Sequence, residues 1–558
     1  MSAGLKIILD YVPDYSSDQL EWFQKSKQGI EPYSDYYVWH PGYYDNATGV
    51  RRVPNNWGTV FGGPAWTWVA SRQKYYWHVF TPEQPELNWR SSKLVEEMKG
   101  VMNFWLDKGV AGFRVDSVSR LFEDAQLRNN SRTIDRTLNQ PETYDMVTQF
   151  RALLDKFIML ETTGTLAQDV AYFGNKTQPG GHLPFLWEFV GAVHSGTNAN
   201  TFNTAINSVM RSVPSGNWYI WFAGNHDRRR VATLAPGLED AINMMLLLLP
   251  GSTITYMGEE IGMTDNTDIT FAQGVDPQGC NAGASGYIAK TRDRSRTPLQ
   301  WDGTTNAGFS TATKTWLPVN NNYKTLNIAA QESAVNSHLK VYKQAAKLRK
   351  TRTIQRGSLN THVISNDIFA FSRELKGEHA YIVVVNTGSI EVAVNLSTAF
   401  TNLPTDAVVE IASVDSGFQT GTLSSHQGEL GSIPGRVTGF SQVGIVPDDA
   451  IGRRVFSGIS LPPSFRQRSI FTSITLIGLK TSLLRAPIWE VELGLTHCPL
   501  SVLPHPPLNY GRATVSWPGD SSASYPDGIV HSRLLPTLSE ALLKSYFQGI
   551  PPPHTNEA

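Results

Sequence analysis

Short apolar runs that end on an acidic residue recur through the N-terminal part of this chain, and they constrain its fold more than any other feature. One run ends at Asp116, a second ends at Glu161, and a third leads to Asp227. Segments with helical spacing of apolar residues lie between them. Repeated βα units place the carboxyl ends of their strands at one face of a (β/α)8 barrel. The pattern therefore predicts an α/β fold of this type, with its functional groups at that face.

The same patterns locate the expected elements. We expect strands at residues 5–9, 112–115, 157–160, 218–223 and 254–257, with a further short segment of this kind at 186–187. The first strand should be buried. Apolar residues at helical spacing predict helices at 94–105, 238–249 and 335–346. After Arg356 the helices stop, and short alternating strands at 363–371, 380–385 and 408–412 predict an antiparallel β-domain.

Composition narrows the possible functions. The chain has 558 residues, of which 41% are hydrophobic, so it can form more than one domain. Its formal net charge of −1 argues against nucleic acid as a partner, because such proteins usually present a basic face. Two cysteines, Cys280 and Cys498, are too few for a metal cluster, and we expect no disulfide between them. We also expect no membrane span and no signal peptide in this chain.

Arg114 and Asp116 lie two positions apart on one expected strand, so both side chains point to the same face. A nearby cation favours the ionised form of a carboxyl group, which is the form that a nucleophile needs. A purely structural ion pair at the end of a strand explains this stretch equally well. Two further strand-end carboxylates favour chemistry, because glycoside hydrolysis needs one carboxylate and one protonated acid.

Several segments carry a family resemblance. Three resemble signature regions of the α-amylase superfamily, glycoside hydrolase family 13: residues 112–116 (GFRVD), 158–161 (IMLE) and 224–227 (GNHD). Three others resemble its α-glucosidase and oligo-1,6-glucosidase branch, and insect maltases most closely: residues 84–88 (QPELN), 258–263 (GEEIGM) and 292–302 (RDRSRTPLQWD). The resemblance extends from Leu5 to about Gly417.

The resemblance implies a retaining α-glucosidase that removes terminal glucose from maltose, sucrose or short oligosaccharides. It implies that Asp116 is the nucleophile, Glu161 the general acid/base and Asp227 the residue that stabilises the transition state. The substrate contacts that it implies come from a larger set: Asp10, Tyr15, Arg114, His226, Arg230 and Arg292. For Arg230 and Arg292 a solvated run of charges remains an alternative.

The resemblance also implies a domain plan. Residues 1–13 and 90–355 would form the catalytic TIM barrel, and residues 14–89 an inserted domain rich in tryptophan and tyrosine. These rings would either stack on sugars or pack the insert's own core. Residues 356–447 would form a β-sandwich-like domain. We expect residues 448–558 to be a disordered extension or a sequence unrelated to the family.

Two departures from the family pattern bear on activity. Asp14-Tyr15 stands where the family usually has Asn-His, and the missing histidine normally donates to the sugar. We expect the loss of such a donor to cost a few kcal/mol in the transition state. The resemblance also begins at the family's third barrel strand, so we expect the first two βα units to be missing and the barrel to be incomplete.

The remaining expectations concern ligands and location. We expect no cofactor and no metal, since any structural calcium site would belong to the missing units. Four sequons predict a glycoprotein at the cell surface or outside the cell: Asn46, Asn129, Asn175 and Asn395. The partner would be a small sugar, and the oligomeric state stays open. A competing hypothesis is a catalytically weakened scaffold that acts as a binding protein, like a transporter heavy chain or a surface receptor.

Overall fold

The computed structural model describes residues 4–154, 156–392, 394–401, 403, 406–416, 421–424, 440–446 and 474–475. Apart from residues 474–475, the predicted tail 448–558 lies outside the described residues. Cys498 also lies outside them. Cys280, in contrast, is described and is disulfide-bonded, so the expectation of no disulfide is wrong.

Parallel strands form the barrel part of the chain. One sheet has the order β1 (Ile8–Tyr11), β7 (Gly112–Val115), β8 (Phe157–Leu160) and β9 (Leu183–Pro184). A second has the order β10 (Ile220–Trp221), β11 (Ser252–Thr255) and β18 (Ile474–Thr475). The strands are apolar because both faces of such a sheet are covered; Phe113, Ile158 and Ile220 are all completely buried.

The first strand differs from its prediction. It begins at Ile8 rather than Leu5, and Leu5 and Ile7 are about half exposed instead of buried. The physical reason is its place in the sheet: among the described residues, β1 pairs with β7 alone. A strand with one paired edge has fewer neighbours to cover its side chains.

Helices connect and cover these strands. The longer ones are α2 (Ser92–Asp107), α3 (Pro141–Leu153), α6 (Ala199–Ser212), α8 (Glu239–Leu248), α10 (Gly283–Lys290) and α12 (His338–Leu348). The shorter ones are α1 (Glu21–Lys27), α4 (Leu166–Ala171), α5 (Glu188–Gly191), α7 (Val231–Leu234), α9 (Pro277–Asn281), α11 (Ile328–Ser333) and α13 (Arg352–Arg356). Single 3-10 turns occur at η1 (Tyr33–Asp35), η2 (Val118–Arg120), η3 (Glu259–Ile261), η4 (Phe271–Gln273), η5 (Asp293–Ser295), η6 (Thr305–Gly308), η7 (Asn321–Lys324) and η8 (Leu396–Thr398).

The helix predictions fail at two residues. Trp105 was expected on the buried face of α2 but is 39% exposed, because the buried face runs through Leu94, Met98 and Met102. Val335 was expected to begin the last helix but is fully exposed and precedes α12. Ser337 caps that helix by accepting a hydrogen bond from the backbone N–H of Lys340.

The segment between β1 and α2 contains two small antiparallel sheets. One has the order β2 (Trp39–His40), β6 (Lys74–Trp77) and β5 (Trp66–Val69), and the other pairs β3 (Tyr43–Asp45) with β4 (Val50–Arg52). Trp57, Trp66 and Trp77 are buried together in one apolar cluster. These rings pack the segment's own core rather than offering a surface for sugars.

The C-terminal part is a six-stranded antiparallel sheet. Its order is β12 (Ser358–Val363), β13 (Ile368–Glu374), β14 (Ala380–Asn386), β17 (Phe440–Val446), β15 (Asp406–Ala412) and β16 (Gly421–Ser424). The single strand predicted at 363–371 is wrong: the chain turns there, and Ile364 N–H donates to the carbonyl of Ile368 at 2.9 Å. Ser365-Asn366-Asp367 supplies residues that favour such a turn.

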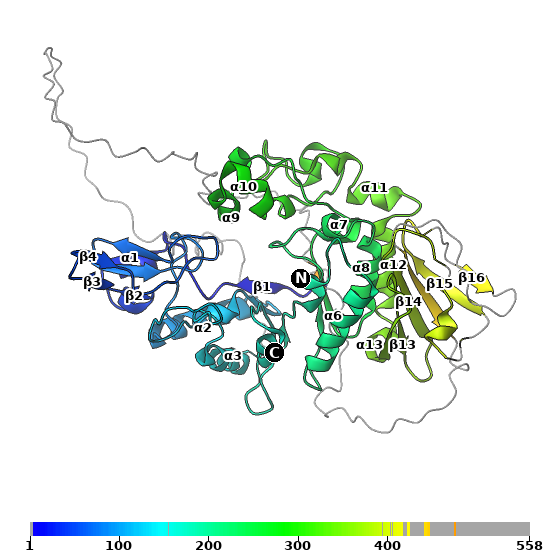
Figure 1. The fold of residues 1–558 in the computed structure, drawn as a ribbon, viewed down its shortest axis with the longest axis horizontal. Coiled ribbons are helices and arrows are strands. Elements are labelled where there is room, and N and C mark those ends of the chain that lie inside the picture. Colours follow the sequence, from blue (N-terminus) through cyan, green and yellow to red (C-terminus); the bar gives the residue numbers. More distant parts are fainter. Residues whose placement is uncertain are drawn as a thin grey trace, which may run out of the picture. The chain divides into compact units, whose positions relative to one another are not determined.

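Helices of the barrel pack against this sheet (Figure 1), and one buried arginine joins the two. Arg373 on β13 is completely buried. Its guanidinium donates to the carbonyls of Leu248 at 2.5 Å, Ile354 at 2.7 Å and Gly357 at 3.0 Å. The positive charge is therefore satisfied by backbone dipoles from α8 and α13.

Candidate active site

The ends of adjacent strands bring three carboxylates together. Asp10 lies in β1, Asp116 follows β7 and Glu161 follows β8. The backbone N–H of Asp116 donates to the carbonyl of Tyr11 at 2.8 Å, and that of Glu161 donates to Val115 at 2.9 Å. These bonds continue the parallel pairing by one residue, so the acidic side chains emerge at the same edge of the sheet.

One guanidinium links all three carboxylates. Nη1 of Arg114 lies 2.8 Å from Oδ1 of Asp10 and 2.5 Å from Oδ1 of Asp116. Nη2 lies 2.8 Å from Oε2 of Glu161. The side chains of Arg114, Asp116 and Glu161 are between 11% and 17% exposed, whereas that of Asp10 is 57% exposed. Asp116 and Glu161 therefore share a cation inside a largely enclosed site, and Asp10 lies at its rim.

Glu161 has the environment of a proton donor. Burial raises its pKa, and the charge of Asp116 together with a hydrogen bond to that residue adds to the rise; against the opposing effect of Arg114, the pKa is raised to about 7. The backbone N–H of Ser117 donates to Oε2 of Glu161 at 3.1 Å. Ser117 has a φ of 43°, in the left-handed region that non-glycine residues rarely occupy. This local conformation directs its N–H toward the glutamate.

Asp227, which follows β10, forms a second group with basic side chains. Nη1 of Arg292 donates to its Oδ1 at 2.9 Å, and Arg296 donates to the same oxygen through Nη2. Nε2 of His226 lies 3.5 Å from Oδ2. Burial raises the pKa of Asp227, but the nearby His226, Arg296 and Arg292 outweigh it and hold the pKa below its ordinary value. The group is thus a carboxylate.

Arg296 is a site residue that the sequence analysis missed. It lies in the segment 292–302 that carries the family resemblance, but only Arg292 was singled out there. Nε of Arg296 also donates to the carbonyl of His226 at 2.8 Å. The turn η5 separates the two arginines and brings both to one aspartate. Their spacing of four residues around a single turn is the signal that could have identified the pair.

Comparison with known proteins shows the family to which this chain belongs. The model of the alpha-amylase catalytic domain matches residues 1–357. The chain belongs to the alpha-amylase family. It is 41% identical over 415 residues to a salivary alpha-glucosidase of Anopheles gambiae, covering 69% of this chain and 70% of that protein. It is 39% identical over 450 residues to maltase A1 of Drosophila melanogaster, covering 75% and 78%.

Solved structures agree with this assignment. The trehalulose synthase MutB from Pseudomonas mesoacidophila superposes with a TM-score of 0.68 at 25% identity, covering 80% of this chain and 84% of that one. The fold of this alpha-amylase family member is therefore a TIM barrel with a C-terminal β-domain. The matching family model and the similar α-glucosidases and maltases show that it is a glycoside hydrolase.

Arg230 is not brought to the carboxylates of this glycoside hydrolase. It is only 2% exposed, so it is not a solvated charge, and the ion pairs of the described residues do not join it to the strand-end carboxylates. Its Nη1 donates to the carbonyl of Met257 at 2.8 Å, and its backbone N–H donates to Oδ1 of Asp265 at 2.8 Å. Its guanidinium lies 4.9 Å from the ring centre of Tyr256. These contacts hold the loop after β11.

Tyr15, in the position where the family usually has histidine, lies near Asp116. Its ring packs edge-on against Phe80, with ring centres 5.3 Å apart. Burial raises the pKa of Tyr15, as do the charges of Asp14 and Asp116. The neighbouring Asp14 is almost completely buried, and burial together with Glu86 raises its pKa well above the ordinary range. The two residues that depart from the family pattern, Asp14 and Tyr15, therefore lie inside the candidate site.

The four sequons lie at exposed positions on this hydrolase. Asn46 lies in the turn between β3 and β4, and Asn395 caps η8. Asn129 accepts a hydrogen bond from the backbone of Asn56 through Oδ1, and Asn175 lies in a turn after α4. Exposure is compatible with glycosylation, which stays a prediction.

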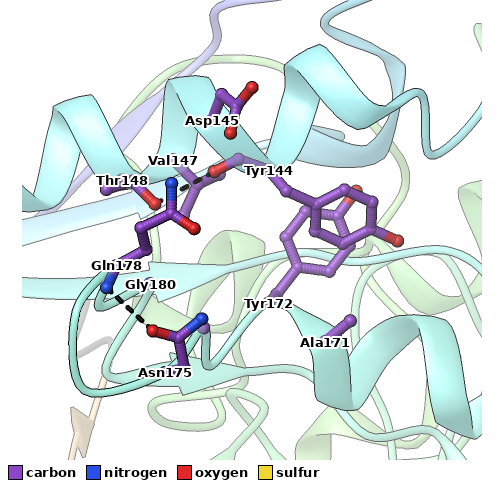
Figure 2. A pocket seen from close by; sticks show the side chains of 10 residues that line it. Tyr144, Asp145, Val147, Thr148, Ala171, Tyr172, Asn175, Gln178 and Gly180 are labelled. Carbon is purple, nitrogen blue, oxygen red and sulfur yellow. Dashed lines mark hydrogen bonds between the residues drawn. The ribbon is translucent and has the colours of Figure 1, made fainter.

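Asn175 also lines a cavity of about 190 Å³ between α3 and the segment 171–180 (Figure 2). Figure 2 shows Gln178 N–H donating to Oδ1 of Asn175 and the rings of Tyr144 and Tyr172 on the opposite side. The cavity shares no residue with the carboxylate cluster. It is therefore separate from the candidate active site.

The described residues contain neither a metal-binding cluster nor a membrane-spanning helix. Within that part of the chain, no group of three or more His, Cys, Asp or Glu side chains is arranged to hold a metal ion. None of the helices described there is both long and apolar enough to cross a bilayer.

Proposed function

We propose that this chain is a retaining, maltase-like α-glucosidase that removes terminal α-linked glucose from maltose, sucrose or short oligosaccharides. The observation that carries the proposal is the guanidinium of Arg114, which contacts Asp116 and Glu161 at once. Relatives named as α-glucosidases and maltases support the substrate class. A variant of MutB in complex with sucrose, 26% identical to this chain, supports a disaccharide site.

In the first step, an oxygen of Asp116 attacks the anomeric carbon while Glu161 gives its proton to the glycosidic oxygen. The bond to the leaving sugar breaks and a glucosyl ester of Asp116 forms. In the second step, Glu161 takes a proton from water, whose oxygen attacks the same carbon and releases Asp116. Arg114 favours the carboxylate form of Asp116, and the raised pKa of Glu161 keeps its proton available near neutral pH.

Asp227 would bind the hydroxyl groups of the reacting sugar. Its lowered pKa keeps it an acceptor, and Arg292 and Arg296 hold it in one orientation. Asp10 and His226 border the same space and would contribute further contacts. The separation of carboxyl groups typical of retaining enzymes, roughly 5–5.5 Å, suits two groups that share one arginine.

We further propose that two βα units complete the barrel beyond the strands described here. The support is that β1 pairs with β7 alone among the described residues, while closure of this barrel needs eight strands. Secretion is also a proposal, which the salivary origin in the relatives' names supports.

The deciding experiment is hydrolysis of p-nitrophenyl α-glucoside by the full chain, by a version with two βα units added at the β1 edge, and by Asp116→Asn of whichever is active. Activity that disappears in Asp116→Asn, with α-glucose as the first product, is the expected result. A folded but inactive completed version would overturn the enzyme proposal in favour of the binding scaffold, for which Tyr15 in place of histidine is the supporting feature.

A further inference from the structure

A carboxylate outside the proposed catalytic group holds one of that group's cations. Asp276 is 2% exposed and lies at the start of α9. Its Oδ1 accepts hydrogen bonds from Nε of Arg292 at 3.1 Å and from Nη2 at 2.5 Å. Its Oδ2 accepts from the backbone N–H of the same arginine at 2.6 Å. Asp276 therefore fixes both the main chain and the side chain of Arg292.

The geometry of the guanidinium makes this contact directional. The group is planar and carries five N–H donors in fixed positions. Asp276 occupies those on Nε and Nη2, which leaves Nη1 to donate to Asp227 at 2.9 Å. The ring of Phe61 lies 4.7 Å from the guanidinium carbon and covers one face. Arg292 is held from one edge and one face, and it presents the remaining edge to Asp227.

We propose that Asp276 is a positioning residue that orients Arg292, and through it Asp227, for the sugar. This inference rests on the proposed α-glucosidase function. Without Asp276 the guanidinium is still attracted to Asp227 but is free to turn. Arginine then favours a two-pronged pair with a carboxylate, which would occupy both oxygens of Asp227. Sugar hydroxyls would lose the acceptors that they need in the transition state.

Asp276 also has a structural role, which the test must separate. It caps α9 by accepting from the backbone N–H of Gln278 at 3.3 Å. Asparagine is an equally good N-cap, so Asp276→Asn keeps the cap and removes the negative charge that holds Arg292.

Asp265→Asn is the matched control. Asp265 is also buried and pairs with Nε of Arg229 at 2.9 Å. The ion pairs of the described residues join it neither to Arg292 nor to Arg296. The variant Asp265→Asn therefore measures how much activity and thermal stability are lost when any buried carboxylate of this region is neutralised.

The experiment measures kcat and KM on p-nitrophenyl α-glucoside for the full-chain protein and for Asp276→Asn, Arg292→Gln, their double variant and Asp265→Asn, with Tm for each. We expect Asp276→Asn to lower kcat/KM about 10- to 100-fold, mostly in kcat, because hydrogen bonds to the sugar strengthen in the transition state. In the Arg292→Gln background it should add less than about twofold. Equal losses in both backgrounds, or an equal loss in Asp265→Asn, would overturn the proposal.

Failure of the proposed function gives a different result. If the unaltered protein does not hydrolyse the glucoside, the proposed function fails, and glucose affinity measured by calorimetry decides the role of Asp276. Weaker binding by about tenfold in Asp276→Asn, absent in the Arg292→Gln background, supports positioning. Unchanged affinity, or no binding by any variant, overturns it.

Discussion

Nη2 of Arg114 lies 2.8 Å from Oε2 of Glu161, so a carboxyl group whose pKa is raised to about 7 is paired with a cation. Burial is the largest cause of that shift, and the negative charge of Asp116 adds to it. The arginine reduces the shift without cancelling it. This balance lets one residue act as acid in one step and as base in the next.

The first prediction concerns the pH dependence of hydrolysis. The general acid must be protonated, so kcat/KM should fall about tenfold per pH unit above a pH of about 7. The check is a pH profile of kcat/KM on p-nitrophenyl α-glucoside. Glu161→Gln should remove the alkaline limb along with most of the activity. A limb near the ordinary glutamate value of 4.5 would contradict the assignment.

A second prediction restores the family's histidine at Tyr15. The phenol ring packs against Phe80 and lies in the field of Asp116, so an imidazole at this position would be within the site. We expect Tyr15→His to raise kcat/KM about tenfold, since a positioned donor stabilises charge that develops in the transition state. Tyr15→Phe, which keeps the ring but offers no donor, is the control. No gain from histidine over phenylalanine would show that this position has lost contact with the sugar.

The third prediction tests the junction between barrel and β-domain at Arg373. Replacing it with methionine keeps much of the buried volume but leaves the carbonyls of Leu248, Ile354 and Gly357 without their donor. We expect the free energy of unfolding to fall by at least ~3 kcal/mol, measured by urea denaturation. Arg356→Met, at an exposed position, should change it by no more than ~0.5 kcal/mol. Equal effects would mean that the buried bonds contribute little.

The fourth prediction links stability to pH through His338. Its Nδ1 lies 2.9 Å from Oδ1 of Asp240, whose Oδ2 accepts from the backbone N–H of Val414 at 2.8 Å. The hydrogen bond to Asp240 and its charge raise the pKa of His338 above the ordinary value of 6.5, against the effect of burial. The added stability is therefore present below pH 6.5 and is lost as pH rises through the higher folded value.

His338→Gln separates this contribution from other titrating groups. The difference in unfolding free energy between the unaltered protein and this variant should be larger at pH 6 than at pH 8.5. A difference that does not change with pH would indicate a neutral histidine at both values.

Much of the barrel could be predicted from sequence because its strands are short apolar runs with acidic ends. The strand at 157–160 was predicted with its observed bounds, since Glu161 ends the apolar run. The predicted strand at 363–371 failed because apolar residues flank Ser365-Asn366-Asp367 on both sides, which hides a hairpin inside one alternating pattern.

The sequence predicted the position of Asp116 at a strand end beside Arg114, while the role of Asp116 stays a prediction. The arginines of the site were harder to predict, because a sequence does not reveal which of several neighbouring cations faces inward. Arg230 was expected at the sugar but is buried against Tyr256, while Arg296 was passed over and contacts Asp227. Tertiary contacts between separate loops decide that choice.

The ring of Phe61, from the segment inserted between β1 and α2, rests on the guanidinium that steadies Asp227. The insert therefore helps to position a residue of the proposed catalytic site, although it contributes none of the strand-end carboxylates. If it detached while the barrel stayed folded, Arg292 would lose its cover and Asp227 its fixed orientation. Enzyme activity would then report the docking of the insert, and would disappear on warming before the barrel itself unfolds.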